Sequence, residues 1–204
     1  MKKYSRLLTA SHIAFAICIS NGDAQDVIVE GRALTVKEPL PVIQTVNGSG
    51  VIFPTSFGDS LLAPCSRPTL GKSTEYWSPT FDDIVRAEEI FSQYTRTHRI
   101  DGREVHVWPN EPMPDSWPDP KTYRRQYIGV IRGSHKTIYA NFIPVSEKLA
   151  DDWRQAPFSI CDGGSSSFGL ETDLTSSSVL HVAFDTCMCK VVPANELFQR
   201  TRSK

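Results

Sequence analysis

Apolar residues between Phe81 and Tyr94 recur every three to four positions, and this long periodic stretch most limits the folds open to the chain. Its apolar members are Phe81, Ile84, Val85, Ala87, Ile90, Phe91 and Tyr94. The polar residues assigned to the opposite face are Asp82, Asp83, Arg86, Glu88, Glu89, Gln93 and Arg96. Either Ser78 with Pro79, or Thr80 with Asp83, can cap the start. The pattern predicts one amphipathic helix of about five turns.

Two pairs of β-prone runs follow this helix. Runs 127–131 and 137–142 flank a Gly-containing turn, and runs 167–174 and 179–185 flank a Ser-rich one. Between the pairs, Leu149 and Trp153 lie on one face of a predicted helical bridge at 146–155. In the register that the alternation favours, the residues sharing one face are Phe168, Leu170, Leu174, Leu180, Val182 and Phe184. The residues then predicted to point outward are Glu171, Asp173, His181 and Asp185.

Together these elements predict an α+β domain at residues 77–204. Its expected form is one long helix packed on a curved antiparallel sheet of about four strands, cystatin-like in outline. Residues 25–76 show no helical period and contain Pro39, Pro41, Pro54, Pro64 and Pro68. Proline removes a backbone donor and is excluded from central strands, so this segment is predicted to be an irregular N-terminal extension.

Residues 1–24 have the order of features expected of a secretory signal peptide. A basic start with Lys2, Lys3 and Arg6 precedes an apolar run from Leu7 to Ile19, and small residues follow at 22–24. We expect cleavage after Ala24 and delivery to the periplasm or the extracellular space. A buried N-terminal helix and a lipoprotein anchored at Cys18 are the alternatives, and the latter lacks the small residue required before the cysteine.

Composition excludes two classes of partner. Residues 1–24 hold three basic residues and one acidic residue, so the remaining chain has 19 basic and 22 acidic side chains and a net charge of −3. That balance is unlike a nucleic-acid-binding surface. No later segment approaches the run of about 20 apolar residues that a membrane-spanning helix needs.

Four cysteines remain after residue 24: Cys65, Cys161, Cys187 and Cys189. An even number in an exported chain predicts two disulfide bonds. Cys187 and Cys189 are two positions apart on a predicted strand and cannot readily pair with each other. We therefore expect one of them to bond to Cys161 and the other to Cys65. A zinc site is the alternative, although the spacing does not match common zinc ligand patterns.

Two groups of residues are candidate binding surfaces. The Pro-rich segment 108–120 carries Trp108 and Trp117, which could contact a partner or fold back over the core. Arg124 and Arg125 lie next to Tyr127 on a predicted strand. Such residues anchor many protein interfaces, but an arginine on a strand can equally be buried against a carboxylate or an aromatic ring.

Several short elements resemble a family of small exported proteins of Gram-negative bacteria that has no assigned activity. They are Tyr123–Gly129 with its RQY-x-G motif, Ile138–Phe142, Trp153, the DGG run after Cys161, and Ser167–Gly169. The chain departs from that family at Asp185-Thr186-Cys187, where an Asn-Gly is usual. The resemblance implies export and a single domain, and it implies no catalytic residues.

Other polar motifs suggest little chemistry. The DGG run at 162–164 could bind an anion through its backbone N–H groups, but it lacks the features of a phosphate-binding loop and is interpreted as a β-bulge. His98, His106, His135 and His181 match no nucleophile or metal motif. His181 near Glu171 and Asp185 is interpreted as part of a solvated face, with a metal or acid/base role as the alternative.

The sequence therefore predicts an exported binding or inhibitory module without a cofactor, whose partner is an envelope or extracellular protein. The alternative is a hydrolase of an envelope polymer that uses a carboxylate pair from Glu171, Asp173 and Asp185.

Overall fold

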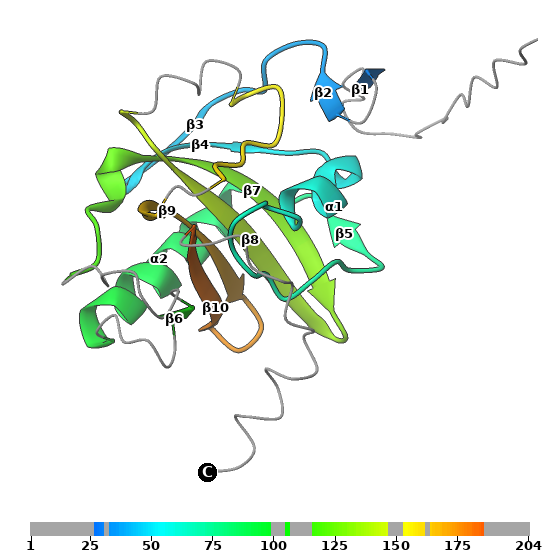
Figure 1. The fold of residues 1–204 in the computed structure, drawn as a ribbon. Coiled ribbons are helices and arrows are strands. Elements are labelled where there is room, and N and C mark those ends of the chain that lie inside the picture. Colours follow the sequence, from blue (N-terminus) through cyan, green and yellow to red (C-terminus); the bar gives the residue numbers. More distant parts are fainter. Residues whose placement is uncertain are drawn as a thin grey trace, which may run out of the picture.

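The computed structural model of the chain describes residues 27–30, 33–98, 105–106, 116–146, 153–161 and 164–185, with side chains from residue 34 onward except at 105–106. Residues 1–26, with the predicted signal peptide, lie outside this part. The centre is a mixed sheet ordered β3-β4-β7-β8-β9-β10-β6 (Figure 1). Its strands are β3 (Ile43–Thr45), β4 (Gly48–Ile52), β5 (Tyr76–Trp77), β6 (Val105–His106), β7 (Tyr123–Arg132), β8 (His135–Pro144), β9 (Gly164–Asp173) and β10 (Ser178–Asp185).

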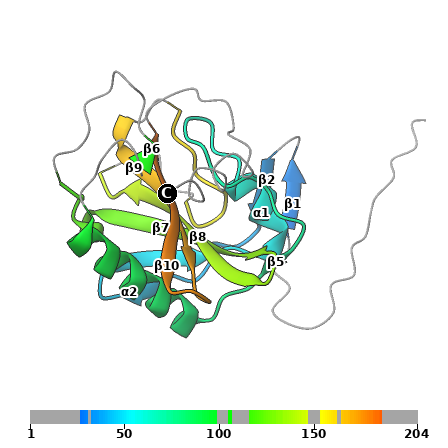
Figure 2. The same ribbon diagram turned by 90° about the horizontal axis from the view of Figure 1, so that it is seen from below.

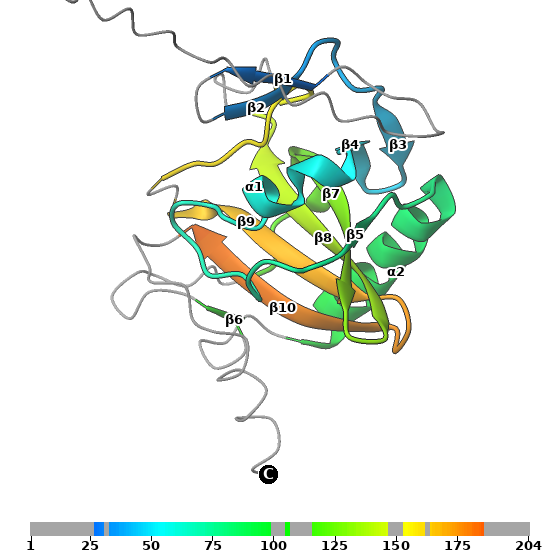
Figure 3. The same cartoon turned by 90° about the vertical axis from the view of Figure 1, so that its right-hand side faces the viewer.

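Strand directions show how the sheet is assembled. Strand β4 pairs in parallel with residues 124–127 of β7, and β5 pairs antiparallel with residues 129–130 along the same edge. The pairs β7–β8, β8–β9 and β9–β10 are antiparallel, and β6 joins β10 in parallel. A separate hairpin is formed by β1 (Val27–Glu30) and β2 (Ala33–Val36), visible apart from the sheet in Figure 3.

The prediction of one long helix on a four-stranded antiparallel sheet is wrong. The two hairpins exist, but β3 and β4 from the supposed irregular extension, and β5 at its boundary, widen the sheet and give it a parallel pair. Prolines flank these strands instead of interrupting them, since Pro41 precedes β3 and Pro54 follows β4. Strands of two to five residues are too short to show the alternation that would have identified them.

The predicted amphipathic helix is α2 (Phe81–Thr97). It begins with the capping box formed by Thr80 and Asp83, in which the Thr80 hydroxyl accepts from Asp83 N and the Asp83 carboxylate accepts from Thr80 N. Two assignments of its faces are wrong: Phe81 is 48% exposed, whereas Glu88 is only 4% exposed. The position of Glu88 in the helix explains its burial, because Glu88 lies four residues after Ile84 and three before Phe91, on the buried face.

The sheet has a core on each face, and Figures 2 and 3 show α2 and the short helix α1 (Gly58–Leu61) on opposite sides of it. Alternation along β8 distributes the side chains, so that Phe142 packs beneath α2 while Tyr139 and Ile143 point to the other face. The face beneath α2 includes Phe168 and Phe184, as the predicted register of β9 and β10 requires.

Two other predicted elements lie partly outside the described residues. In the helical bridge predicted at 146–155, residues 147–152 are not described and Trp153–Gln155 form a turn. In the DGG run, Gly164 has φ +61° and pairs with Asp185 across an irregularity between Phe184 and Asp185. That irregularity supports the β-bulge interpretation.

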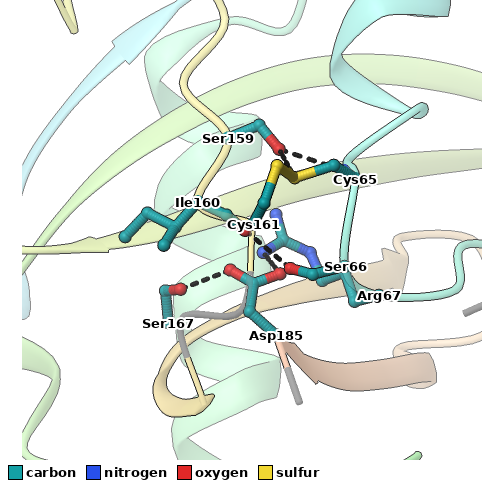
Figure 4. The surroundings of a disulfide bond; sticks show 8 residues. All are labelled: Cys65, Ser66, Arg67, Ser159, Ile160, Cys161, Ser167 and Asp185. Carbon is teal, nitrogen blue, oxygen red and sulfur yellow. Dashed lines mark hydrogen bonds and ion pairs between the residues drawn. A yellow bond between two sulfur atoms is a disulfide. The ribbon is translucent and has the colours of Figure 1, made fainter. Parts of the chain in front are cut away.

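Cys65 is bonded to Cys161, so the predicted pairing of one of them with Cys187 and of the other with Cys189 is wrong (Figure 4). Residues 65–66 run beside 159–160, where Ser159 Oγ accepts from Cys65 N at 3.1 Å and Ile160 O accepts from the Ser66 hydroxyl at 2.6 Å. This pairing of two loops, 94 residues apart in sequence, brings the cysteines together. Cys187 and Cys189 lie outside the described residues.

Peptide mapping without reduction should therefore recover a cross-link between Cys65 and Cys161. Because the bond joins residues 96 positions apart, replacing both cysteines by Ala should lower the free energy of unfolding by about 2 to 4 kcal/mol, measured by urea denaturation. Recovery of Cys161 joined to Cys187 or Cys189 would contradict this arrangement of the loops.

Candidate functional site

The sheet face opposite α2 carries buried polar side chains under a cover formed by residues 58–72 and 153–161. We call these side chains, together with Arg67 from the cover, the polar layer: Arg67, Tyr139, Asn141, Ser167, Glu171, Asp173, His181 and Asp185, each at most 5% exposed. The prediction that the three carboxylates and the histidine point to solvent is therefore wrong. Their shared face was predicted correctly, but the covering residues 58–72 are about 100 positions away in sequence and were predicted to be irregular, and residues 153–155 were predicted to be part of a helical bridge.

Arg67 lies at the centre of the polar layer. Its Nη1 is 2.7 Å from Asp185 Oδ1, and its Nη2 donates to Asn141 Oδ1 at 2.5 Å and to the Tyr139 hydroxyl at 3.1 Å. Asp185 also accepts from the Ser167 hydroxyl (Figure 4). Burial by itself lowers the pKa of Arg67, but Tyr139 and Asp185 raise it overall, so the guanidinium stays charged.

Arg67 reaches this position because β9 has no side chain at Gly169. A Cβ atom there would lie 2.6 Å from both Arg67 Nε and the Tyr139 hydroxyl. The amide of Asn141 continues the network by donating to Gln126 Oε1 at 3.0 Å and to Phe158 O at 2.7 Å. These contacts attach both covering segments to the sheet.

The other two carboxylates of the polar layer, those of Glu171 and Asp173, also have ion-pair and hydrogen-bond partners. Glu171 forms two contacts with Arg132, at 2.9 and 3.0 Å, and accepts from the Thr137 hydroxyl. Burial would raise the pKa of Asp173, but hydrogen bonds led by that from the Ser176 hydroxyl lower it from the usual 3.8, and His135 Nδ1 is 2.7 Å away.

The partners of His181 and of the carboxylates determine what these candidate acid/base groups can do. His181 Nε2 donates to Pro68 O at 2.9 Å, which binds the ring to the covering segment. Each carboxylate of the layer has a cationic or histidine partner of its own. Within the described part of the chain, no three His, Cys, Asp or Glu side chains converge as metal ligands. The polar layer is consequently suited to holding the covering segments.

The predicted binding residues Arg125 and Tyr127 lie in the core beneath α2. Arg125 Nε is 3.1 Å from Glu88 Oε1, and its guanidinium lies 5.0 Å from the centre of the Phe142 ring. Glu88 Oε1 also accepts from the Tyr127 hydroxyl at 2.6 Å. Burial and the neighbouring Glu88 carboxylate raise the pKa of Tyr127 well above its usual value, which keeps the hydroxyl protonated as a donor.

Arg125 also fixes two pieces of backbone on the surface above it. Its Nη2 donates at 2.8 Å to Asn47 O and at 2.8 Å to Pro120 O. Gly48, at φ +138°, leaves room for this guanidinium, because a Cβ there would collide with Arg125 Nη1. Of the two interpretations of Arg125, the structure shows burial, with the side chain against the Glu88 carboxylate and the Phe142 ring.

The other predicted binding residues are distributed differently. Arg124 is half-buried with its guanidinium 5.7 Å from the Trp153 ring, on the opposite face from Arg125. Trp117 is half-buried and packs edge-on against Phe91 at 5.8 Å. Trp108 lies outside the described residues. The structure therefore brings Trp117 close to the surface backbone held by Arg125, and places Arg124 elsewhere.

A small open pocket of about 180 Å³ lies where these elements meet. Helix α2 contributes Phe91, Ser92 and Thr95 to its wall, the β3–β4 turn contributes Asn47, and the segment 117–120 contributes Trp117 and Asp119. Pro118 and Pro120 complete the lining. Pockets that enclose drug-sized ligands measure about 300 to 1,000 Å³, so this one suits a single side chain or ring.

The pocket is held in shape by bonds from both sides. Trp117 Nε1 donates to His98 O at 2.7 Å, and Asn47 Nδ2 donates to Glu88 Oε2 at 2.9 Å. Asp119 caps the short 3₁₀ helix Pro120–Thr122 by accepting from Lys121 N at 2.9 Å. Within the lining, the buried pair of Glu88 and Arg125 holds Asn47 and Pro120 in place.

Sequence reasoning identified Trp117 in this pocket and missed the rest of its polar lining. Asn47 immediately precedes Gly48, and Asn-Gly between two β-prone runs is a strong hairpin signal that could have revealed β3 and β4. Asp119 and Thr95 carry no comparable signal, because only the tertiary structure brings α2 to the 117–120 segment.

No helix among the described residues is long and apolar enough to cross a bilayer. Comparisons with known proteins found no matching family model, no similar curated protein and no similar solved structure.

Proposed function

We propose that the chain is an exported binding module that recognises an envelope or extracellular protein through the pocket between α2 and Trp117. The observation that carries this proposal is the combination of an open, aromatic-lined pocket with a polar layer whose carboxylates are all buried and matched. Tryptophan in a preorganised pocket is a frequent anchor of protein interfaces, because little conformational entropy is lost on binding.

Export is part of the same proposal. The basic, apolar and small-residue order of residues 1–24 supports a signal peptide cleaved near Ala24. The disulfide bond between Cys65 and Cys161 agrees with an oxidising compartment such as the periplasm or the extracellular space. Membership in the uncharacterised exported family with RQY-x-G and DGG elements belongs to this proposal too.

Capture from envelope extracts with three baits tests the binding role. The baits are the mature chain, a Thr95→Arg variant and a Gln93→Arg variant. Thr95 lines the pocket, whereas Gln93 is exposed nearby on the same helix, so the two variants add the same side chain inside and outside the pocket. Matching melting temperatures would establish that both variants are folded.

The proposal expects at least one protein to be retained by the mature chain and by Gln93→Arg, and to be lost from Thr95→Arg. Equal retention by all three baits would place the binding surface elsewhere. Retention of no protein by the mature chain would contradict a binding role.

A further inference from the structure

The hydrogen-bonding groups that line the pocket are unequally distributed between donors and acceptors. Three of its side-chain donor groups already have a partner: Asn47 Nδ2 donates one of its two protons to Glu88, Trp117 Nε1 donates to His98 O, and the Thr95 hydroxyl donates to Ser92 O. Since a carboxylate can only accept, the Asn47 amide nitrogen must face Glu88, and Asn47 Oδ1 is left on the other side. Pro118 and Pro120 have no backbone N–H to offer.

What remains toward the opening is mainly acceptors. Asn47 Oδ1 and Asp119 Oδ2 have no hydrogen-bond partner within the described part of the chain, and Thr95 Oγ1 keeps lone pairs after donating its proton. The Ser92 hydroxyl can still donate, but it already accepts from Arg96 Nη2 at 3.2 Å. An occupant that satisfies this lining must bring several donors and few acceptors.

The charge and shape of the pocket lining further limit which ligand can bind. Among the described residues that line the pocket, Asp119 is the one acidic residue and none is basic. The Trp117 ring and the prolines form an apolar wall beside it. Lys and Arg side chains have an aliphatic stem, a cationic head and only donors, and Arg in particular stacks on aromatic rings.

Resting on the proposed function, we infer that the pocket binds a basic side chain, Arg or Lys, of the partner protein. The stem lies against Trp117, and the head donates to Asp119, Asn47 and Thr95. Arg96 lies one turn further along α2, and its guanidinium is bound to Ser92 at the rim of the pocket. Its positive charge repels the cation in the pocket. Two charges of opposite sign therefore flank the site, and each can be removed separately.

The test uses ¹⁵N-labelled mature protein titrated with N-acetyl-arginine amide and N-acetyl-lysine amide, followed by NMR. The neutral isostere N-acetyl-citrulline amide is the control ligand. The basic probes should shift the Trp117 indole resonance and the backbone resonances of Ser92 and Thr95, and citrulline should bind more weakly. Equal binding of citrulline and arginine would overturn the inference.

Two variants give effects of opposite direction. Asp119→Asn keeps the side-chain cap on Lys121 N but removes the charge, and should weaken arginine binding about two- to fivefold. Arg96→Gln should strengthen it by a similar factor. The exposed Asp82, at the far end of α2, provides the control Asp82→Asn, which should change nothing. Unchanged affinity in both Asp119→Asn and Arg96→Gln would overturn the inference.

Failure of the basic-side-chain inference can be distinguished from failure of the proposed function. If the basic probes shift no pocket resonance but Thr95→Arg still loses its envelope partner, the ligand class is wrong and the binding role stands. If the probes bind but every bait retains the same proteins, the basic-side-chain site stands and the pocket is not the surface that selects the partner.

Discussion

Replacing Glu88 by Lys should leave the chain unfolded at room temperature or close to it. Glu88 accepts from Tyr127 and Asn47 and lies 3.1 Å from Arg125 Nε, and both charged side chains are almost fully buried. A lysine there would place two cations side by side in the core. Breaking a buried ion pair costs about 3 to 5 kcal/mol, and reversing one charge costs more. That range is comparable with the whole stability of a domain.

The adjacent residue supplies the control. Glu89 is exposed on the outer side of α2, so Glu89→Lys should change the free energy of unfolding by less than about 1 kcal/mol. Far-UV circular dichroism and urea denaturation of the two variants measure the difference. Similar stabilities would mean that Glu88 is not buried against Arg125, and that the helix faces are assigned wrongly.

Replacing Asp185 by Asn should destabilise the chain nearly as strongly. Arg67 would keep its charge under the covering segments but lose its counter-ion, with an expected cost of about 3 to 5 kcal/mol in urea denaturation. Replacing both residues, as in Arg67→Met with Asp185→Leu, removes the unpaired charge and should recover much of the loss.

A second ion pair shows how much of this effect comes from burial. Lys72 and Asp59 are 3.0 Å apart, but their side chains are 62% and 54% exposed. Lys72→Met should therefore change stability by less than about 1 kcal/mol. If Asp185→Asn were equally mild, Asp185 would be solvated and the polar layer would be an accessible face.

The sequence was most informative where a pattern is local. The capping box at Thr80 and Asp83, the two long hairpins and the shared face of Phe168 and Phe184 all follow from residues within about twenty positions of each other. Local patterns failed for Glu88, because a charged residue on a periodic stripe was assigned by its type instead of by its position.

Long-range partners could not be predicted in this way. Arg67 lies in a Pro-rich stretch, and its counter-ion Asp185 is 118 residues away. Without Arg67 and its segment, the carboxylates of β9 and β10 have no visible partner and resemble a solvated face. The pocket has the same origin, since Asn47, Thr95 and Asp119 come from three segments that meet only in the folded chain.

Hydrogen–deuterium exchange of the mature chain, with and without the envelope protein that it retains, tests the central claim most directly. If the pocket binds the partner and the polar layer is structural, exchange should become slower on binding at residues 92–95 and 117–121 and stay unchanged at residues 65–72 and 159–161. Slower exchange confined to 65–72 and 159–161 would place the partner on the covering segments and contradict the account.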